Sequence, residues 1–270
     1  MNKTLRLILL LFIVACSRKE DVVTGTYDKY FCGDSLTTDL VFYPVEEYAD
    51  YYLPDTPALK LVFITTEVFP CIDFGITTRE FTIEDEMIIR FENIIRPDFC
   101  YTAIGSAYTL IDLPERINKL VLINGKSVDV FQLSTTREFV HLSPLNESFA
   151  HAQYEKTFRY PENSFAYICG TNKDNTHLCT DFLNILLDST EVSEIEFVGE
   201  GRIPYPESSS GNWVNHKSRF FSYSQESDFE NAGNLLRNFT IKNLSPNDGV
   251  TISLVSWNNR KYMSWMMDGR

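Results

Sequence analysis

Short segments rich in β-branched and aromatic residues, separated by turn signals, dominate the stretch between residues 59 and 142, and they allow few structures other than antiparallel β-sheet. The clearest case is residues 119–123 and 127–131, two strand-like segments that flank Asn124-Gly125. Asn-Gly favours the type I′ turn, whose twist matches that of paired strands. The pattern therefore predicts a β-hairpin at this position.

Neighbouring segments have the same character. Expected strands or strand pairs lie at residues 59–64, at residues 80–83 with 87–91, and at residues 137–142. Glu84–Glu86 is expected to form a polar three-residue loop within the second of these. Several short strands separated by turn residues are typical of a sandwich. We therefore expect a mainly β protein whose N-terminal domain, residues 26–145, is an antiparallel β-sandwich.

The second half of the chain has a mixed pattern. Pro144 and its polar neighbours interrupt the strand rhythm, which favours a boundary near residue 145. Thr180 is expected to cap a short helix. Further expected elements are a helix at residues 227–236, a strand at 194–198, and a hairpin of residues 250–257 and 260–265 across Asn258-Asn259. Residues 146–270 are thus expected to form a smaller α+β domain.

Composition narrows the functional classes. The chain has 270 residues, of which 44% are hydrophobic and 23% charged. These values suit a globular protein and exclude a disordered, collagen-like or coiled-coil chain. The formal net charge is −13 and no cluster of Lys and Arg offsets it. Because such a surface repels phosphate, we expect no nucleic-acid partner.

The first fifteen residues have the layout of a secretory signal peptide. Lys3 and Arg6 precede an apolar run at residues 7–15. About nine apolar residues are too few to cross a bilayer, which needs roughly 20. The chain is therefore expected to be exported.

The end of this run, Leu11-Phe12-Ile13-Val14-Ala15-Cys16, resembles the lipobox of bacterial lipoproteins. The resemblance implies cleavage before Cys16, acylation of Cys16, and a lipidated tether over residues 16–25. Each buried acyl CH₂ contributes about 0.8 kcal/mol, so two or more chains would anchor the protein to a membrane. The alternative is an ordinary secreted protein in which a cysteine follows the leader by chance.

Three short features resemble those of Bacteroidota lipoproteins. Lys19-Glu20-Asp21 is similar to the export signal of surface lipoproteins, and Asp34-Ser35-Leu36 and Asp188-Ser189-Thr190 are similar to O-glycosylation sites of that phylum. The resemblance implies an outer-membrane lipoprotein, on the periplasmic face or at the cell surface. It implies nothing about activity.

The remaining cysteines fit an oxidising compartment, where disulfides persist. Cys169 and Cys179 flank a short polar loop, and Cys71 and Cys100 bracket the hairpin expected at residues 80–91. Both pairs are candidate disulfides, which leaves Cys32 as a buried or reactive thiol. Zinc would be an alternative use of the thiols, but no Cys-x-x-Cys or His-x-x-x-His pair is present.

No catalytic pattern stands out. The chain has no Gly-x-Ser-x-Gly elbow. Ser208–Ser210 near His216, and Cys179 near His177, are more simply a loop and a disulfide cysteine. We therefore assign no catalytic residue.

Two groups of oxygen-bearing side chains are candidate binding sites. Glu194 and Glu196 would share one strand face, either as a functional pair or as an ordinary solvated face. Asn172, Asp174 and Thr176 alternate like the start of a calcium loop, but the glycine and final glutamate of an EF-hand are absent. We expect neither a metal nor another cofactor.

Aromatic residues supply the binding candidates. Tyr43, Tyr48, Tyr51 and Tyr52 lie close together in sequence among acidic residues, and Trp213 lies in a loop rich in Pro and Ser. A tyrosine ring offers a flat apolar face with a polar tip, which suits sugars and proteins. The alternative is that these rings fill the core.

The sequence thus predicts a lipid-anchored envelope lipoprotein that acts as a non-catalytic binding or interaction module. Its partners would be the membrane, through Cys16, and a glycan or protein ligand. One alternative is a surface hydrolase that uses paired carboxylates. Another is a purely structural component of the envelope.

Overall fold

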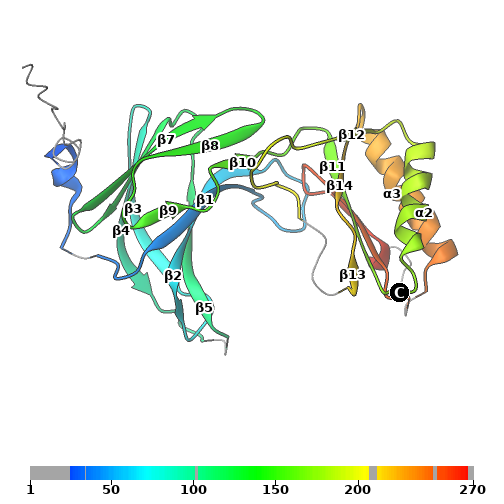
Figure 1. The fold of residues 1–270 in the computed structure, drawn as a ribbon, viewed down its shortest axis with the longest axis horizontal. Helices are drawn as coiled ribbons and strands as arrows, with labels where there is room; N and C mark the ends of the chain where they lie inside the picture. The colour runs from blue at the N-terminus through cyan, green and yellow to red at the C-terminus, as the bar shows by residue number, and fades with distance from the viewer. Residues whose placement is uncertain (1–24, 34, 101–102, 207–211, 246–247, 267–270) are drawn as a thin grey trace, which may run out of the picture.

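The computed structural model describes residues 25–33, 35–100, 103–206, 212–245 and 248–266. The chain is mainly β, with a large curled sheet followed by a smaller sheet that carries two helices (Figure 1). The expected fold class is therefore confirmed. The leader, Cys16, Lys19–Asp21, Asp34 and Ser208–Ser210 lie outside the described residues.

The first sheet has the strand order β10-β8-β7-β6-β4-β3-β5-β2-β1-β9. In chain order its strands are β1 (Leu40–Glu47), β2 (Ala58–Phe69), β3 (Gly75–Ile83), β4 (Glu86–Ile95), β5 (Gly105–Asp112), β6 (Lys119–Asn124), β7 (Ser127–Thr135), β8 (Phe139–Asn146), β9 (Ala150–Ala152) and β10 (Lys156–Phe158). A short 3₁₀ helix, η1 (Asp28–Tyr30), precedes them. Most pairs are antiparallel, but β1 with β9, β3 with β5, and β4 with β6 are parallel. Hairpin patterns in the sequence predict only antiparallel neighbours, so these parallel pairs were not expected.

The sheet curls around its main core. Five strands separate β1 from β7 in the sheet, yet the rings of Phe42 and Phe131 pack edge to face with centroids 4.8 Å apart. Phe63 and Phe91 extend this cluster, with centroids 5.2 Å from Phe42 to Phe63 and 5.1 Å from Phe63 to Phe91. All four rings are fully buried. The inner faces of distant strands therefore pack against one another as the two layers of a sandwich do.

The β6–β7 hairpin is present, but its turn differs from the expected one. Asn124 pairs with Ser127, so the loop consists of Gly125 and Lys126. Gly125 has φ +61° whereas Lys126 has no positive φ, which is the pattern of a type II′ turn and not of type I′. The Asn124 side chain instead accepts a hydrogen bond from the Leu36 N–H (2.7 Å) and donates to its carbonyl (3.1 Å). Asn124 thereby ties the N-terminal segment to the sheet.

The β3–β4 loop is one residue shorter than predicted. Ile83 pairs with Glu86, which leaves Glu84 and Asp85 in the turn. Glu84 has φ +54°, a conformation that costs a non-glycine residue roughly 1–2 kcal/mol.

Replacing Glu84 with glycine is expected to raise the free energy of unfolding by about 0.5–1 kcal/mol, since the strain relieved exceeds the extra entropy of the unfolded chain. Urea denaturation measures the change. Asp85→Gly is the control and should not stabilise, because Asp85 has no positive φ. Equal stability of wild type and Glu84→Gly would show that the turn is not strained.

The second sheet has the order β12-β14-β11-β15-β16, and β13 pairs with β11 beside it. Its strands are β11 (Ser164–Thr171), β12 (Ser193–Ile195), β13 (Val214–Asn215), β14 (Arg219–Ser222), β15 (Thr251–Ser256) and β16 (Lys261–Met263), and a 3₁₀ helix, η2 (Ser264–Met266), follows. The helices α2 (His177–Ser189) and α3 (Glu226–Asn243) cover one face of this sheet (Figure 1). The predicted β15–β16 hairpin is confirmed.

Three expected elements of this half have different bounds. α2 begins at His177, so Thr180 lies within the helix and does not cap it. α3 continues to Asn243, and Gly233 serves a close contact within it, since a Cβ there would lie 2.6 Å from the Tyr262 ring. β12 ends at Ile195, three residues before the end of the strand expected at residues 194–198.

The first sheet continues beyond the boundary expected at residue 145. β8 runs through Pro144, which pairs with Phe131 next to an irregularity in the register. β9 and β10 then join opposite ends of the same sheet. The β9 region is held by Asp129, whose carboxylate accepts hydrogen bonds from the Phe149 and Ala150 N–H groups at 2.9 and 2.8 Å.

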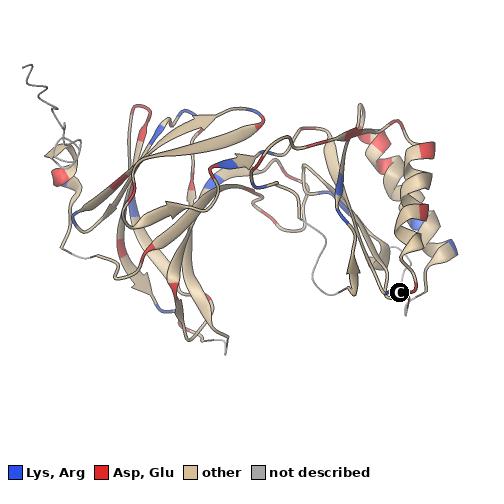
Figure 2. Ribbon diagram, viewed as in Figure 1, with Lys and Arg blue, Asp and Glu red and all other residues tan. Residues whose placement is uncertain are grey.

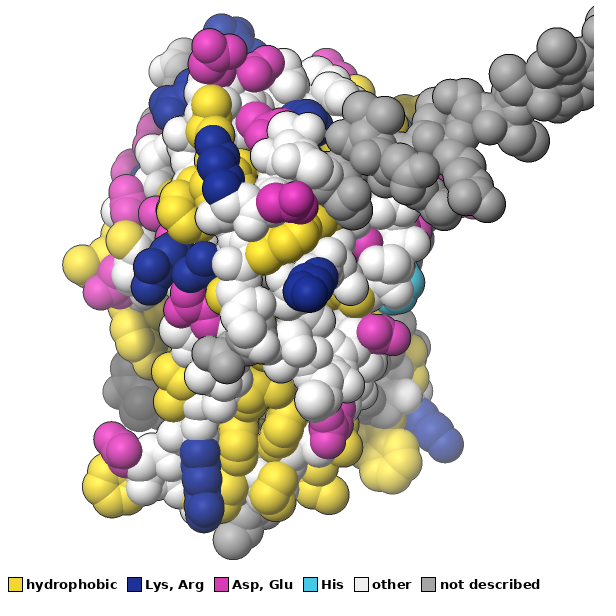
Figure 3. All heavy atoms as spheres, turned by 90° about the vertical axis from the view of Figure 1, so that its left-hand side faces the viewer, with side chains coloured by type: hydrophobic (Ala, Val, Ile, Leu, Met, Phe, Trp, Pro, Cys, Tyr) yellow, Lys and Arg dark blue, Asp and Glu magenta, His cyan; other side chains and the backbone are white. Residues whose placement is uncertain are grey.

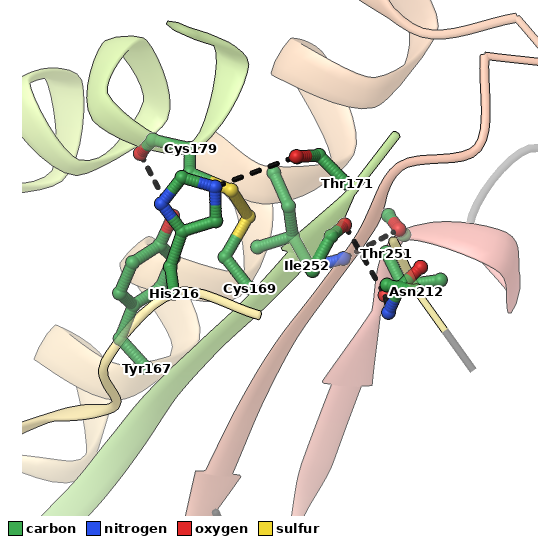
Figure 4. The surroundings of a disulfide bond; sticks show 10 residues. Tyr167, Cys169, Thr171, Cys179, Asn212, His216, Thr251 and Ile252 are labelled. Carbon is green, nitrogen blue, oxygen red and sulfur yellow. Dashed lines mark hydrogen bonds between the residues drawn. A yellow bond between two sulfur atoms is a disulfide. The ribbon is translucent and has the colours of Figure 1, made fainter. Parts of the chain in front are cut away.

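Both predicted disulfides are present. The Cα atoms are 5.3 Å apart in Cys71–Cys100 and 5.9 Å apart in Cys169–Cys179. Cys169–Cys179 joins β11 to α2, and the Tyr167 hydroxyl donates to the Cys179 carbonyl at 2.8 Å (Figure 4). Closing loops of this length stabilises a protein by about 3 kcal/mol each in the chain-entropy account. Cys32 takes part in neither disulfide.

Candidate functional site

A cleft of about 1170 Å³ lies where the two sheets meet. The first sheet contributes the end of β7, the following turn and the start of β8, together with Glu115 and β10. The second half contributes the end of β12 and the residues after it. The lining residues are Glu115, residues 135–139, Lys156, residues 158–162 and residues 195–198. Strand ends from both halves therefore build the walls.

One wall of the cleft is aromatic and bridges the two halves. Phe158 of β10 and Phe197 pack with ring centroids 5.1 Å apart. The Lys156 ammonium lies 4.3 Å from the Phe158 ring centroid and 5.4 Å from that of Phe139. It also donates to the Val198 carbonyl at 3.2 Å. This wall is thus fixed by stacking and by a cation–π contact.

Carboxylates supply most of the charge of the cleft. Glu115 pairs with Arg159 at 2.8 Å. Glu138, Glu162 and Glu196 are exposed, and their side chains have no partner in the part of the chain that the structure describes. Figure 2 shows acidic and basic residues mixed where the sheets meet, and acidic residues along α2 and α3. The cleft therefore offers three carboxylates that are free to bind a ligand.

A buried ion pair holds the junction beneath the cleft. Arg159 Nε donates to Glu46 at 2.8 Å, and the Tyr160 N–H donates to the second oxygen of the same carboxylate at 2.6 Å. Glu46 belongs to β1 and its side chain is only 5% exposed. Burial by itself would lower the pKa of Arg159, but its bonds to Glu46 and Glu115 outweigh that effect and raise it. The two acidic residues thus keep the arginine charged and in place.

The tip of the β15–β16 hairpin makes a second junction. The Asn259 side-chain amide donates to the carbonyls of Asp50, Tyr51 and Leu53 at 2.9, 3.1 and 2.9 Å. The Tyr48 hydroxyl donates to the Trp257 carbonyl at 2.8 Å. These bonds fix the loop after β1 against the second sheet.

The five aromatic residues predicted as binding candidates are not brought together. Tyr43 is half-buried under Arg202, Tyr48 lies in the junction, and Tyr51 and Tyr52 form an exposed pair with centroids 5.0 Å apart. Trp213 is exposed next to Lys173. None of the five lines the cleft.

Residues of the cleft were mostly missed by sequence reasoning. Of the residues that line the cleft, the sequence singles out only Glu196 as a candidate, paired with Glu194 on one strand face. In the structure Glu194 forms a salt bridge with Arg219, whose hydrogen bonds hold the pKa of Glu194 below its usual range. Glu196 lies beyond the end of β12 and lines the cleft, whereas Glu194 does not. The two carboxylates therefore do not act as a pair.

The Asn172 oxygen of the calcium-like segment is already occupied. Asn172 Oδ1 accepts hydrogen bonds from the N–H groups of Asp174 (3.0 Å) and Asn175 (2.8 Å), which stabilise the turn before α2. Among the residues that the structure describes, no three His, Cys, Asp or Glu side chains are grouped to hold a metal. The alternation in this segment is thus explained by a turn.

Several buried tyrosines make the stability of the fold depend on pH in the alkaline range. Burial raises the pKa values of Tyr48, Tyr160 and Tyr205, and it raises that of Tyr223 to about 12. Tyrosine in an unfolded chain ionises near pH 10. Their contribution is thus fully present below pH 10 and is lost as the pH rises towards the folded-state values.

We expect the free energy of unfolding to be level between pH 7 and 9 and to fall above pH 10, by about 1.4 kcal/mol per pH unit for each such tyrosine. Urea denaturation at successive pH values measures this fall. Above pH 10, Tyr160→Phe should make the fall in the free energy of unfolding shallower by about 1.4 kcal/mol per pH unit, because one titrating group is lost. Unchanged stability at pH 11 would contradict the assignment.

Exposed apolar side chains gather at the far end of the first sheet. Figure 3 shows them at the lower end of that face, where β2 ends and β5 begins in Figure 1. The exposed hydrophobic residues near these strand ends are Val68, Ile72, Ile95, Phe99 and Ile104. Cys71–Cys100 connects the loops that carry Ile72 and Phe99. Clusters of this kind are a feature of interaction surfaces, and this one is separate from the cleft.

Within the described parts of the chain, no helix combines the length and apolar character needed to span a bilayer. Comparison with known proteins adds no further constraint: no family model, no curated protein and no solved structure matches this chain.

Proposed function

We propose that this chain is a lipid-anchored envelope lipoprotein that acts as a non-catalytic binding module, with its ligand held in the cleft between the two sheets. The observation that carries the binding role is the cleft itself. Its aromatic wall is fixed by Phe158, Phe197 and Lys156, and three of its four glutamates have no partner among the residues that the structure describes. Sites whose side chains are already in place bind without a large ordering cost.

The anchor rests on the sequence Leu11–Cys16. Acylation at Cys16 would place the folded body next to a membrane, on the periplasmic face or at the cell surface. Labelled palmitate should be incorporated into wild type and not into Cys16→Ala, which should leave the membrane fraction. Identical labelling and fractionation of the two proteins would overturn the anchor.

Binding is tested with the full chain in detergent, screened against an array of envelope glycans and a library of extended peptides. A ligand of the cleft should bind at least tenfold more weakly to Phe197→Ala, because the ring forms part of the wall. Ile185→Ala on the exposed side of α2 is the matched control and should bind normally. Ligands that do not distinguish the two variants would contradict the cleft as the site.

A surface hydrolase remains the second candidate, because four glutamates line the same cleft. Pairs of carboxylates carry out glycoside hydrolysis. Release of reducing ends from an envelope polysaccharide that stops in both Glu138→Gln and Glu196→Gln would favour this function. Turnover that survives both substitutions would count against the role of these two carboxylates.

A further inference from the structure

We propose that the cleft takes an extended, positively charged polypeptide segment, which pairs with the open edge of β12. This inference rests on the proposed binding function and specifies its ligand.

β12 is the last strand of the second sheet. Its Ser193–Ile195 backbone pairs with β14 on one side, and no described residue pairs with it on the other. Glu196 and Phe197 continue the chain into the cleft and form no backbone hydrogen bond with a described residue. A row of unpaired N–H and C=O groups is a template for an added strand. A polypeptide is the ligand that satisfies such a row.

The charges beside this edge favour a cationic ligand. Glu138, Glu162 and Glu196 have no partner among the described residues, whereas the cations Lys156 and Arg159 are already engaged. Arg137 is the one other cation among the lining residues. Alternate side chains of an added strand point to opposite faces, so basic residues at every second position could reach the carboxylates. The net charge of −13 would also attract a cationic segment over longer distances.

The aromatic rings favour a peptide over a glycan. A sugar needs an open ring face for stacking, but the Lys156 ammonium already lies over Phe158 and near Phe139, and Phe197 packs against Phe158. Among the large apolar side chains that line the cleft, the exposed one is Val198, at 77%. Val198 suits the apolar side chains of a peptide that alternates basic and apolar residues.

The test is fluorescence anisotropy of the full chain in detergent with three labelled octapeptides. The first alternates Lys and Val, the second alternates Glu and Val, and the third is the Lys-Val peptide with every backbone nitrogen methylated, so that neither edge of the strand can donate. We expect the Lys-Val peptide to bind at least tenfold more tightly than either of the others. Its affinity should fall at least tenfold in Glu138→Gln/Glu196→Gln.

Asp181→Asn/Asp188→Asn is the matched control, since it removes two exposed carboxylates of α2 and should leave affinity within twofold. Equal binding of the methylated peptide would overturn strand addition, and equal binding of the Glu-Val peptide would overturn the charge argument. A glycan that binds through Phe197 when no peptide binds would refute this inference and leave the proposed function standing. If no glycan or peptide depends on Phe197, the proposed function fails as well.

Discussion

Replacing Arg159 with alanine is expected to lower the free energy of unfolding by about 3–5 kcal/mol. The substitution leaves the Glu46 carboxylate buried with only the Tyr160 N–H as a partner. It also removes the donor to the Thr136 carbonyl, at 3.0 Å, in the turn that lines the cleft. Most of the loss comes from the uncompensated buried charge and not from the attraction of the original pair. Urea denaturation monitored by tryptophan fluorescence measures it.

Arg219→Ala provides the matched control for Arg159→Ala. Arg219 forms a salt bridge with Glu194, and their side chains are 34% and 41% exposed. Exposed pairs contribute about 0–1 kcal/mol, so the control should lose no more than that. Equal losses in the two variants would show that the junction at Glu46 is solvated and does not hold the sheets together.

Replacing Asp129 with alanine is expected to cost a similar amount, about 3–5 kcal/mol. Asp129 is fully buried, and its carboxylate accepts hydrogen bonds from the Phe149 and Ala150 N–H groups and, at 2.6 Å, from the Ser148 hydroxyl. Each buried donor left without an acceptor costs about 1–3 kcal/mol. The loss should be accompanied by faster amide exchange in β9, because these bonds hold it beside β1.

Asp112→Ala is the control for Asp129→Ala. Asp112 is 81% exposed and pairs with Lys60 at the surface, so its loss should cost less than about 1 kcal/mol. Slow exchange in β9 despite the loss of Asp129 would show that β9 is held by its pairing with β1 alone.

Local features of the fold could be predicted from sequence because their partners are close in the chain. The β6–β7 and β15–β16 hairpins could be predicted because strand-like segments lie on either side of a turn. The two disulfides could be predicted because Cys71 and Cys100 bracket a hairpin and Cys169 and Cys179 bracket a short loop. The turn type was wrong because the Asn124 side chain is hydrogen-bonded to the backbone of Leu36, a contact that the local pattern does not reveal. The start of α2 was wrong by one turn, because Thr176 and not Thr180 precedes the helix.

The cleft could not be predicted, because its residues come from four separate parts of the chain. Glu46 and Arg159 are 113 residues apart, and Phe158 and Phe197 meet only when the two sheets are placed together. The parallel pairing of β4 with β6 has the same origin, since β5 intervenes in the chain and lies elsewhere in the sheet. The tyrosines at residues 43–52 were proximate in sequence, but strand alternation and the loop after β1 point them to different surroundings.

Amide hydrogen exchange of the full chain, with and without the Lys-Val octapeptide, tests the central claim most directly. An added strand along β12 should protect alternate amides within residues 195–198 from exchange, and this protection should be lost with the backbone-methylated peptide. The amides of α2 should be unaffected. Tight binding of the peptide with no change in exchange at residues 195–198 would place the ligand elsewhere and contradict the assignment of this cleft.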